Sequence, residues 1–253
     1  VEGSGFLIEA DALRMGLGQV FHAASKNEIR PELAGVLFCF NEEPSCLTMA
    51  ATDSYRLAEK KIKLLQGAEK IRVIMPSRAA QEIDHILSLG KSAEAEKNVR
   101  IMINENQVVL RNNEVELVSR LVEGQYPDYT QIIPNEFKTV AEFSSGQLIK
   151  EIKTASLFTT MGINAVVFDL NLGSGAIIVS STSTQTGEYK SEVGAEIKGE
   201  NNKILLNHRY VLDGLANMNS ETSFLKVVSP DSACVFAPKN DDSYVYVVMP
   251  IRQ

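Results

Sequence analysis

The side chains that most often catalyse reactions are sparse in this sequence. The three histidines, His22, His85 and His208, are predicted to lie on three different helices, and none forms an HExxH pair or a comparable pair of metal ligands. The sequence contains no GxSxG nucleophile elbow and no GxxxxGK[ST] phosphate loop. Gly173-Ser174-Gly175 stands between two predicted strands and not at the start of a helix, so it indicates a hairpin turn. We therefore expect no catalytic activity, no metal and no cofactor.

A set of widely spaced basic side chains suggests contact with phosphate groups instead. Five of them are predicted to lie on or just after the helices described below, away from the apolar stripe of each helix: Arg14, Lys26, Lys150, Lys153 and Arg209. Lys and Arg contacts with phosphates bind duplex DNA without regard to its sequence. The alternative is an ordinary solvated helix face, since Glu82, Asp84, Glu151 and Asp213 dilute the basic pattern. No aromatic-rich basic patch accompanies these residues, so capture of single strands is not expected.

The overall charge points the other way. The net charge is −7, whereas phosphate-binding domains usually carry a basic excess. Net charge is only a sum, however, and a protein can be acidic on most of its surface and basic on one face. Only the distribution of charge along the chain can resolve this conflict.

Length and composition place the chain among globular proteins of two ordinary domains or one large one. Of its 253 residues, 44% are hydrophobic and 23% are charged, and no run approaches the roughly 18 consecutive apolar residues of a membrane span. The cysteines Cys39, Cys46 and Cys234 show no CxxC spacing, and the region after Val1 has no apolar core of a signal peptide. We expect a reduced, cytoplasmic protein without membrane contact.

The elements that must position the basic residues recur four times along the chain. Each repeat begins with a short apolar run, followed by a residue that can cap a helix and by apolar residues at helical spacing. The capping residues are Asp11, Ser77, Ser144 and Asn207, so that successive caps lie 66, 67 and 63 residues apart. Such even spacing predicts four copies of one structural unit.

Strands are predicted after each helix. They cover residues 35–40 and 47–52, 99–103 and 107–111, 165–170 and 176–180, and finally 224–228, 233–236 and 244–249. The short connections between them contain Asn and Gly, which is typical of hairpins and hence of antiparallel sheets. The unit β-α-β-β-β therefore occurs four times. We predict an α+β fold of two similar domains, residues 1–134 and 135–253, each built from two such units, with two helices packed on antiparallel sheets.

Five stretches of the sequence resemble signature stretches of a known family, the bacterial DNA sliding clamp or beta subunit of DNA polymerase III. They are residues 30–38 (RPELAGVLF), 51–58 (ATDSYRLA), 123–129 (EGQYPDY), 207–213 (NHRYVLD) and 246–252 (YVVMPIR). They occur in the order and spacing of the family, and the resemblance covers nearly the whole chain as the second and third of three domains. It implies the DNA-clamp fold and a homodimeric ring, a processivity factor whose helices line a hole around duplex DNA.

The resemblance also implies a pocket for peptides that end in Leu and Phe. Through it the family holds the alpha subunit of DNA polymerase III, the clamp loader and other partners. The matching positions here are Arg30, Leu33, Thr52, Ser54, Tyr55, Arg56, Leu57, Pro127, Gln131, Ile132, Asn207, Tyr210, Val247, Val248, Met249, Pro250, Ile251 and Arg252. Aliphatic walls with a polar rim suit such a pocket, and Met249 is a soft, adaptable wall.

The sequence departs from the family at three places around this pocket. Ser54-Tyr55 stands where the family often has Gly-His, Glu32 stands at a frequently aromatic position, and Gln253 replaces a usual apolar end. Ser54-Tyr55 is expected to narrow the pocket mouth. Peptide preference is therefore expected to differ in detail from that of the family.

Other interpretations remain open from the residues alone. Residues 247–249 on their own indicate a buried edge strand, Asp53 a turn residue and Arg56 a surface ion pair. A peptide or small-molecule scaffold unrelated to DNA is the alternative to a clamp. In the family, the first domain of one subunit joins the third domain of the other, and that first domain is missing here. The chain is therefore expected to be mainly monomeric.

Overall fold

The computed structural model describes residues 4–27, 29–89, 97–160 and 162–252. The chain divides into two compact units, Val1–Pro127 and Asp128–Gln253. The sequence placed the change of domain a few residues later, near residues 133–136. In the structure, Tyr129, which is 4% exposed, and the short 3-10 helix η3 (Thr130–Ile132) already belong to the second unit.

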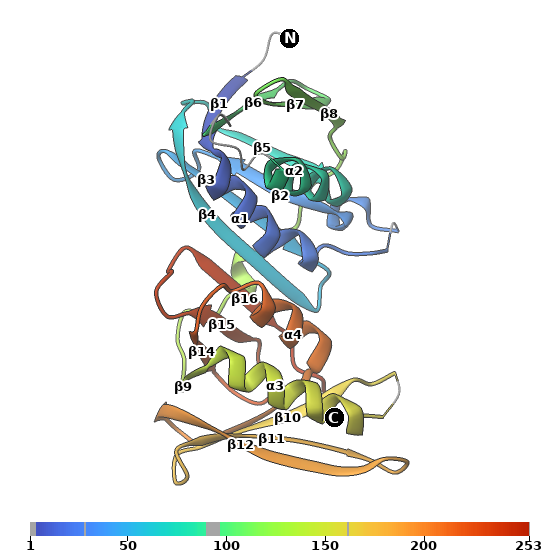
Figure 1. Cartoon of the computed structure of the whole chain (residues 1–253), viewed down its shortest axis with the longest axis vertical. Coiled ribbons are helices and arrows are strands. Elements are labelled where there is room, and N and C mark those ends of the chain that lie inside the picture. Colours follow the sequence, from blue (N-terminus) through green and yellow to red (C-terminus); the bar gives the residue numbers. More distant parts are fainter. Residues whose placement is uncertain (1–3, 28, 90–96, 161, 253) are drawn as a thin grey trace. The chain divides into compact units, whose positions relative to one another are not determined.

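The first unit is a helix pair on one continuous antiparallel sheet (Figure 1). Its elements are β1 (Ser4–Glu9), α1 (Ala10–Val20), β2 (Gly35–Phe40), β3 (Cys46–Thr52), β4 (Arg56–Gln66), β5 (Ile71–Pro76), α2 (Ser77–Leu89), β6 (Asn98–Ile103), β7 (Gln107–Asn112) and β8 (Val115–Arg120). The strands pair in the order β5-β2-β3-β4-β1-β6-β7-β8. Two 3-10 helices, η1 (Phe21–Ala23) and η2 (Pro31–Ala34), connect α1 with β2.

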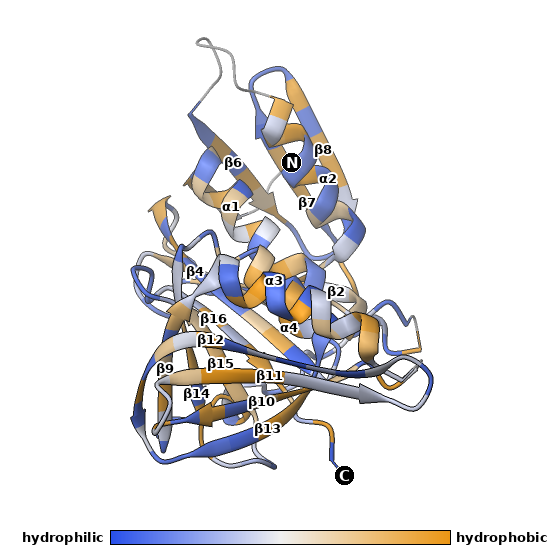
Figure 2. Ribbon diagram, turned by 60° about the horizontal axis from the view of Figure 1, so that its bottom comes forward, coloured by the Kyte–Doolittle hydropathy of each residue, from blue (hydrophilic) through white to orange (hydrophobic). Residues whose placement is uncertain are grey.

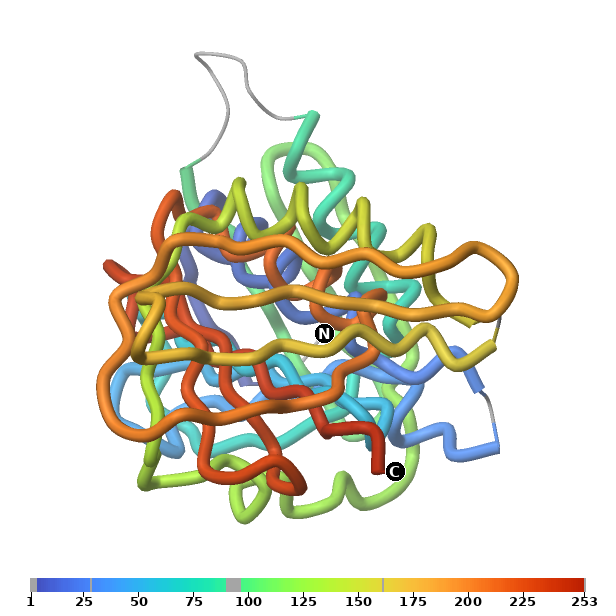
Figure 3. Tube along the Cα trace, turned by 90° about the horizontal axis from the view of Figure 1, so that it is seen from below, coloured from blue at the N-terminus to red at the C-terminus, as the bar shows by residue number. Residues whose placement is uncertain are grey.

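The second unit repeats this plan. Its elements are β9 (Thr139–Ser144), α3 (Ser145–Ala155), η4 (Ser156–Phe158), β10 (Ala165–Asn171), β11 (Ala176–Ser183), β12 (Gly187–Gly199), β13 (Asn202–Asn207), α4 (His208–Ala216), β14 (Thr222–Val227), β15 (Cys234–Pro238) and β16 (Tyr244–Val248). Its strands pair antiparallel in the order β13-β10-β11-β12-β9-β14-β15-β16. Figure 3 shows β10, β11 and β12 running side by side. Strand for strand, this is the order of the first unit.

The four predicted β-α-β-β-β repeats are therefore confirmed. The helices of each unit pack on each other, α1 on α2 and α3 on α4. Each presents its apolar stripe to the sheet, so that Leu13 and Leu17 of α1 and Leu148 and Ile152 of α3 are fully buried. Along α3 and α4 hydrophobic and hydrophilic residues alternate at helical spacing (Figure 2). The opposite faces of the helices remain available to solvent.

The helix starts differ in detail from the prediction. Ser144 and Asn207 are the N-cap residues of α3 and α4, as predicted, and the side chain of Asn207 accepts a bond from the backbone N–H of Arg209 at 3.0 Å. The predicted caps Asp11 and Ser77 are wrong by one or two residues, because both already lie within the first turn of their helices. An acidic residue there still interacts favourably with the helix dipole.

Helix α4 approaches its sheet more closely than a side chain would allow. A Cβ atom on Gly214 would lie 2.3 Å from two ring carbons of Tyr246. Gly214 thereby lets the helix backbone rest directly on the aromatic ring of β16, which is fully buried. By contrast, a Cβ atom on Gly146 of α3 would meet nothing within 4 Å.

Three further features of the described residues concern the cysteines, membrane-spanning helices and metal sites. All three cysteines are free, with Cys39 and Cys234 buried. No helix in the described part of the chain is both long and apolar enough to cross a membrane. Among the described residues, no three His, Cys, Asp or Glu side chains gather closely enough to hold a metal ion.

Candidate functional site

The first group of predicted pocket residues lies on the β3–β4 hairpin of the first unit. Thr52 ends β3, Arg56 and Leu57 begin β4, and Ser54 and Tyr55 form the turn between them. Thr52, Arg56 and Leu57 are buried, whereas Tyr55 is 63% exposed. The turn thus presents Ser54 and Tyr55 to solvent on a buried base.

Arg56 is not the surface ion pair that its sequence suggested. Its guanidinium Nε lies 3.0 Å from Asp53 Oδ2, and the two side chains are only 6% and 15% exposed. Removing two charges from water costs free energy, which only a close, hydrogen-bonded ion pair such as this one can offset. Arg56 therefore holds the turn together, and Asp53 is its partner.

The other predicted residues of the first unit lie on two nearby loops. Leu33, in η2, is 3% exposed, and Pro127 is exposed at the end of the unit. Arg30 is exposed and its Nε donates to Glu32 Oε1 at 2.9 Å. Backbone hydrogen bonding, together with this bond from Arg30, holds the pKa of Glu32 below its usual range. The departure at Glu32 thus ties up Arg30 in a local ion pair.

The second group of predicted residues lies at the end of the second unit. Val247 and Val248 are fully buried in β16, paired with Val235 and Cys234 of β15. Met249 follows the strand and is half-buried, so the predicted buried strand ends one residue earlier than expected. The segment continues as Pro250, Ile251 and Arg252, and the Ile251 backbone N–H donates to the carbonyl of Leu205 on β13 at 2.8 Å.

The remaining predicted residues of the second unit have defined local roles. Asn207 caps α4, as described above. The carbonyl of Tyr210 accepts a bond from the hydroxyl of Tyr246 at 2.8 Å, which ties α4 to β16. Gln131 is exposed and donates from Nε2 to Asp128 Oδ2 at 2.9 Å, while Ile132 is 40% exposed.

The five basic residues lie on or beside the helices. Lys150 and Lys153 are exposed on α3, and Arg209 is exposed in the first turn of α4. Lys26 is exposed in the loop after η1 and not on α1 itself. The three basic residues of the second unit are therefore accessible to a phosphate group on the outer faces of α3 and α4.

Arg14 has a more acidic environment than the other four. Its Nε lies 3.7 Å from Asp11 Oδ1, one turn earlier on α1, and its side chain is only 28% exposed. Asp84 of the neighbouring α2 is close enough to interact with it: burial raises the pKa of Asp84, and the charges of Arg14 and His85 oppose that rise. Arg14 is therefore expected to contribute less to phosphate binding than Lys150 or Lys153.

His208, the first residue of α4, does not lie on the outer face of the helix. It is 8% exposed, and burial, with the charge of Arg209 adding to it, lowers its pKa from the ordinary value of 6.5. The fold therefore favours neutral His208. Its contribution to stability is present above pH 6.5 and is lost as the pH falls toward the lowered pKa.

We predict that the free energy of unfolding of the wild type falls between about pH 7.5 and pH 5.5 more steeply than that of His208→Gln, which cannot take up the proton. Urea denaturation at the two pH values, followed by far-UV circular dichroism, measures the difference. His22 and His85 remain in both proteins and cancel. An equal pH dependence of the two proteins would show that His208 is accessible to protons in the folded state.

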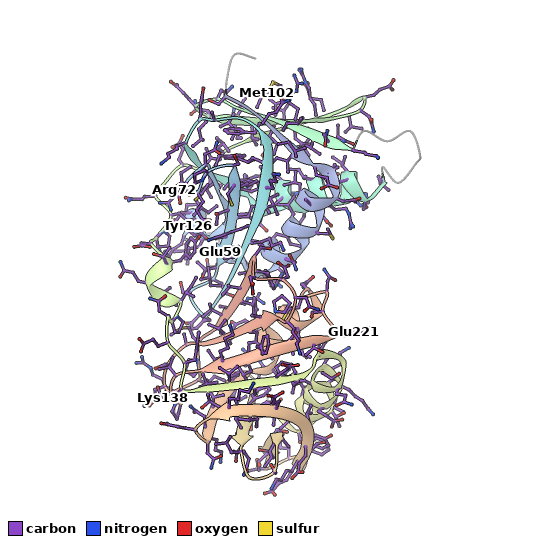
Figure 4. All side chains as sticks on the ribbon, turned by 90° about the vertical axis from the view of Figure 1, so that its left-hand side faces the viewer. Glu59, Arg72, Met102, Tyr126, Lys138 and Glu221 are labelled. Carbon is purple, nitrogen blue, oxygen red and sulfur yellow. The ribbon has the colours of Figure 1, made fainter. Side chains whose placement is uncertain are left out.

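Two residues near the site were missed from the sequence. The hydroxyl oxygen of Tyr126, which is 4% exposed, accepts a bond from the Thr52 backbone N–H at 3.0 Å. Tyr126 also lines a cavity of about 720 Å³ in the first unit, together with Leu37, Ile74 and Arg72. Figure 4 labels Arg72 and Tyr126 on the side of the sheet away from the helices. The second missed residue is Tyr246. Both tyrosines lie in stretches that resemble the family, residues 123–129 and 246–252, but no pattern in the sequence indicates the bonds that their hydroxyl groups make.

Comparison with known proteins divides the chain into the same two parts. Residues 7–128 match the central domain of the DNA polymerase III beta subunit, and residues 130–252 match its C-terminal domain. Proteins named beta sliding clamp from Staphylococcus epidermidis and Staphylococcus aureus are 32% identical over 246 residues, which cover 97% of this chain. The chain spans 63% of the length of these relatives.

Solved structures extend the comparison to the fold. The DNA polymerase sliding clamp from Bacillus subtilis superposes with a TM-score of 0.91 at 30% identity, covering all of this chain and 65% of that one. The DNA polymerase III beta subunit from Thermotoga maritima gives a TM-score of 0.91 at 26% identity, with 66% of that chain covered. The two matched domains coincide with the two compact units of the chain. The helices and strands of these units form the predicted repeats. The chain therefore belongs to the DNA polymerase III beta subunit family, of which it contains the central and the C-terminal domain.

Proposed function

We propose that this chain is the central and C-terminal part of a DNA sliding clamp, which encircles duplex DNA as a homodimeric ring and tethers the replicative polymerase. It is a non-catalytic processivity factor of the cytoplasm. The observation that carries the proposal is the set of four repeated helices, two of which, α3 and α4, carry exposed basic residues on the faces that the sheets do not cover. The family membership of both units supports it.

The same proposal accounts for the net charge. Duplex DNA meets only the outer faces of the helices, where Lys150, Lys153 and Arg209 are exposed. Contacts of this kind are electrostatic, independent of sequence and weak enough to allow sliding. An acidic remainder keeps DNA from the outer surface, so a net charge of −7 is compatible with DNA as a partner.

A second part of the proposal concerns protein partners. The predicted pocket residues would bind peptides that end in Leu and Phe, carried by the alpha subunit of DNA polymerase III, the clamp loader and other proteins. The support is chemical: exposed Tyr55, Pro127 and Ile132 and half-buried Met249 offer apolar contacts. A chain limited to these two domains is expected to be mainly monomeric.

Alanine at Arg14, Lys26, Lys150, Lys153 and Arg209 is expected to weaken binding to a fluorescent DNA duplex at low ionic strength. Each lost phosphate contact should reduce the slope of log K against log salt by about one unit. Fluorescence anisotropy over a range of salt concentrations measures both quantities. The substitution Arg14→Ala alone should have the smallest effect, because Asp11 and Asp84 already offset its charge.

The control removes the same charge from elsewhere. Alanine at five exposed lysines outside the helices, Lys63, Lys70, Lys138, Lys203 and Lys239, also changes the net charge from −7 to −12. It should leave the salt slope near that of the wild type. If both variants lose the same affinity, binding follows net charge alone and the helix faces are not the DNA-contact surface.

A further inference from the structure

The turn between β3 and β4 is held by more hydrogen bonds than a hairpin requires. The backbone N–H of Thr52 donates to the Tyr126 hydroxyl at 3.0 Å, and that of Ser54 donates to Thr52 Oγ1 at 3.1 Å. The Thr52 hydroxyl in turn donates to the carbonyl of Arg56 at 2.6 Å. These bonds fix Ser54 with φ at +77°, a conformation that costs a non-glycine residue free energy.

Asp53 completes the set. Its Oδ1 accepts from the backbone N–H groups of Tyr55 and Arg56, both at 3.0 Å, and its Oδ2 pairs with the Arg56 guanidinium at 3.0 Å. Its own N–H donates to the carbonyl of Arg56 at 3.4 Å. All five backbone N–H groups from residue 52 to residue 56 therefore have an acceptor.

The repeat within the chain shows that the fold itself does not require this arrangement. The hairpin between β11 and β12 occupies the same place in the second unit, and its turn residues are Thr184, Gln185 and Thr186. None of the three is ionisable, and the Gln185 backbone N–H donates to the hydroxyl of Ser183 at 3.3 Å. An equivalent hairpin thus forms without a buried Asp–Arg pair. Its left-handed residue is a glycine, Gly187 with φ at +91°, which adopts this conformation without the cost that Ser54 carries.

Tyr126 extends the arrangement to a second loop. Its ring is buried, and burial raises the pKa of its hydroxyl, so the phenol stays protonated. It directly precedes Pro127, and the segment before it is anchored by the bond from the Val122 backbone N–H to the carbonyl of Ile74 at 2.8 Å. One hydroxyl therefore joins the loop that carries Pro127 to the turn that carries Ser54 and Tyr55.

We propose that Asp53 and Tyr126 are positioning residues of the peptide pocket, an inference that rests on the function proposed above. They hold the exposed Ser54 and Tyr55, and Pro127, in one conformation before a peptide arrives. A preformed wall avoids the entropy cost of ordering a loop on binding, which gives tighter binding without any new contact. Neither residue touches the peptide in this arrangement.

The test compares Asp53→Ala, Asp53→Asn and Tyr126→Phe with the wild type, using an acetylated peptide that ends in Leu-Phe. Calorimetry should show the largest loss, about 10-fold or more, for Asp53→Ala, which removes three bonds. Asp53→Asn keeps an acceptor for the two N–H groups and should recover part of this loss. Tyr126→Phe leaves the buried Thr52 N–H without its acceptor and should lose about 5-fold. Hydrogen exchange at the amides of residues 53–56 should accelerate in parallel.

Ile101→Val serves as the stability control, because Ile101 is fully buried in β6 and belongs to none of these loops. It should lower the melting temperature by about as much as the Asp53 and Tyr126 variants do. Its peptide affinity and its hydrogen exchange at the amides of residues 53–56 should stay unchanged. Equal losses of affinity in Ile101→Val and Asp53→Ala would overturn the inference, as would normal affinity in Asp53→Ala and Tyr126→Phe. A wild type that ignores the peptide would overturn the pocket proposal, and this inference with it.

Discussion

Replacing Met249 by glutamate is expected to abolish binding of a Leu-Phe-ended peptide, with a loss of at least about 100-fold in affinity. Met249 is half-buried directly after β16, and the backbone beyond it is fixed by the bond from Ile251 to Leu205. Burial of the peptide's Leu and Phe is worth roughly 1.5–3 kcal/mol each before ordering costs, so wild-type affinity should be on the order of micromolar. A carboxylate at this wall would lose its water without gaining a partner. Isothermal titration calorimetry measures the loss.

Three further variants define the specificity of that result. Met249→Leu keeps the volume and apolar character and should bind nearly as the wild type does. Lys63→Ala, on the exposed side of β4, should leave the binding heat unchanged. Leu57→Asp should also abolish binding, but Leu57 is 2% exposed, so a charge there disrupts β4 as well. Full binding by Met249→Glu would remove Met249 from the pocket.

Gly214→Leu is expected to lower the free energy of unfolding of the second unit by about 3 kcal/mol or more. The new side chain has to occupy the space of the Tyr246 ring, which is fully buried and cannot move without disturbing β16. The displaced ring would also withdraw its hydroxyl from the carbonyl of Tyr210. Urea denaturation followed by circular dichroism should show one transition shifted to lower urea concentration.

Gly146→Leu is the matched control for this prediction. The substitution is the same and also lies in a helix, but nothing stands within 4 Å of the new Cβ atom. Because leucine favours helix more than glycine does, stability should change by less than about 1 kcal/mol and toward the stable side. Similar destabilisation at both positions would mean that helix propensity, and not the contact with Tyr246, requires glycine at position 214.

The sequence predicted the repeats well because their helices and central strands carry strong patterns. It did not locate β4, β8 and β12, the last strand of three repeats. Charged residues crowd β4 (RLAEKKIKLLQ) and β12 (GEYKSEVGAEIKG), and only one residue of β12 is buried. Along β8 no residue is buried. A strand with little buried surface shows weak alternation, so its position is set by pairing with its neighbour and not by its own composition.

The candidate site was only partly predictable for a different reason. Residue types and the family resemblance indicated Thr52–Leu57 and the region around Met249, but not which side chains hold the others. The bond from Thr52 to Tyr126 joins residues 74 positions apart, and no local pattern encodes such a pair. His208 is a related case: it lies next to the capping residue Asn207 at the start of α4, yet it is only 8% exposed in the folded chain.

The strand order has a consequence for how the chain is made. In each unit the first strand synthesised, β1 or β9, ends up in the middle of the sheet, between β4 and β6 or between β12 and β14. Within the first unit, the partners of β2, β3 and β4 all lie in residues 4–76, so this half of the sheet can assemble as the ribosome delivers it. One edge of β1 must then wait for β6, which leaves an open strand edge exposed to other nascent chains during synthesis.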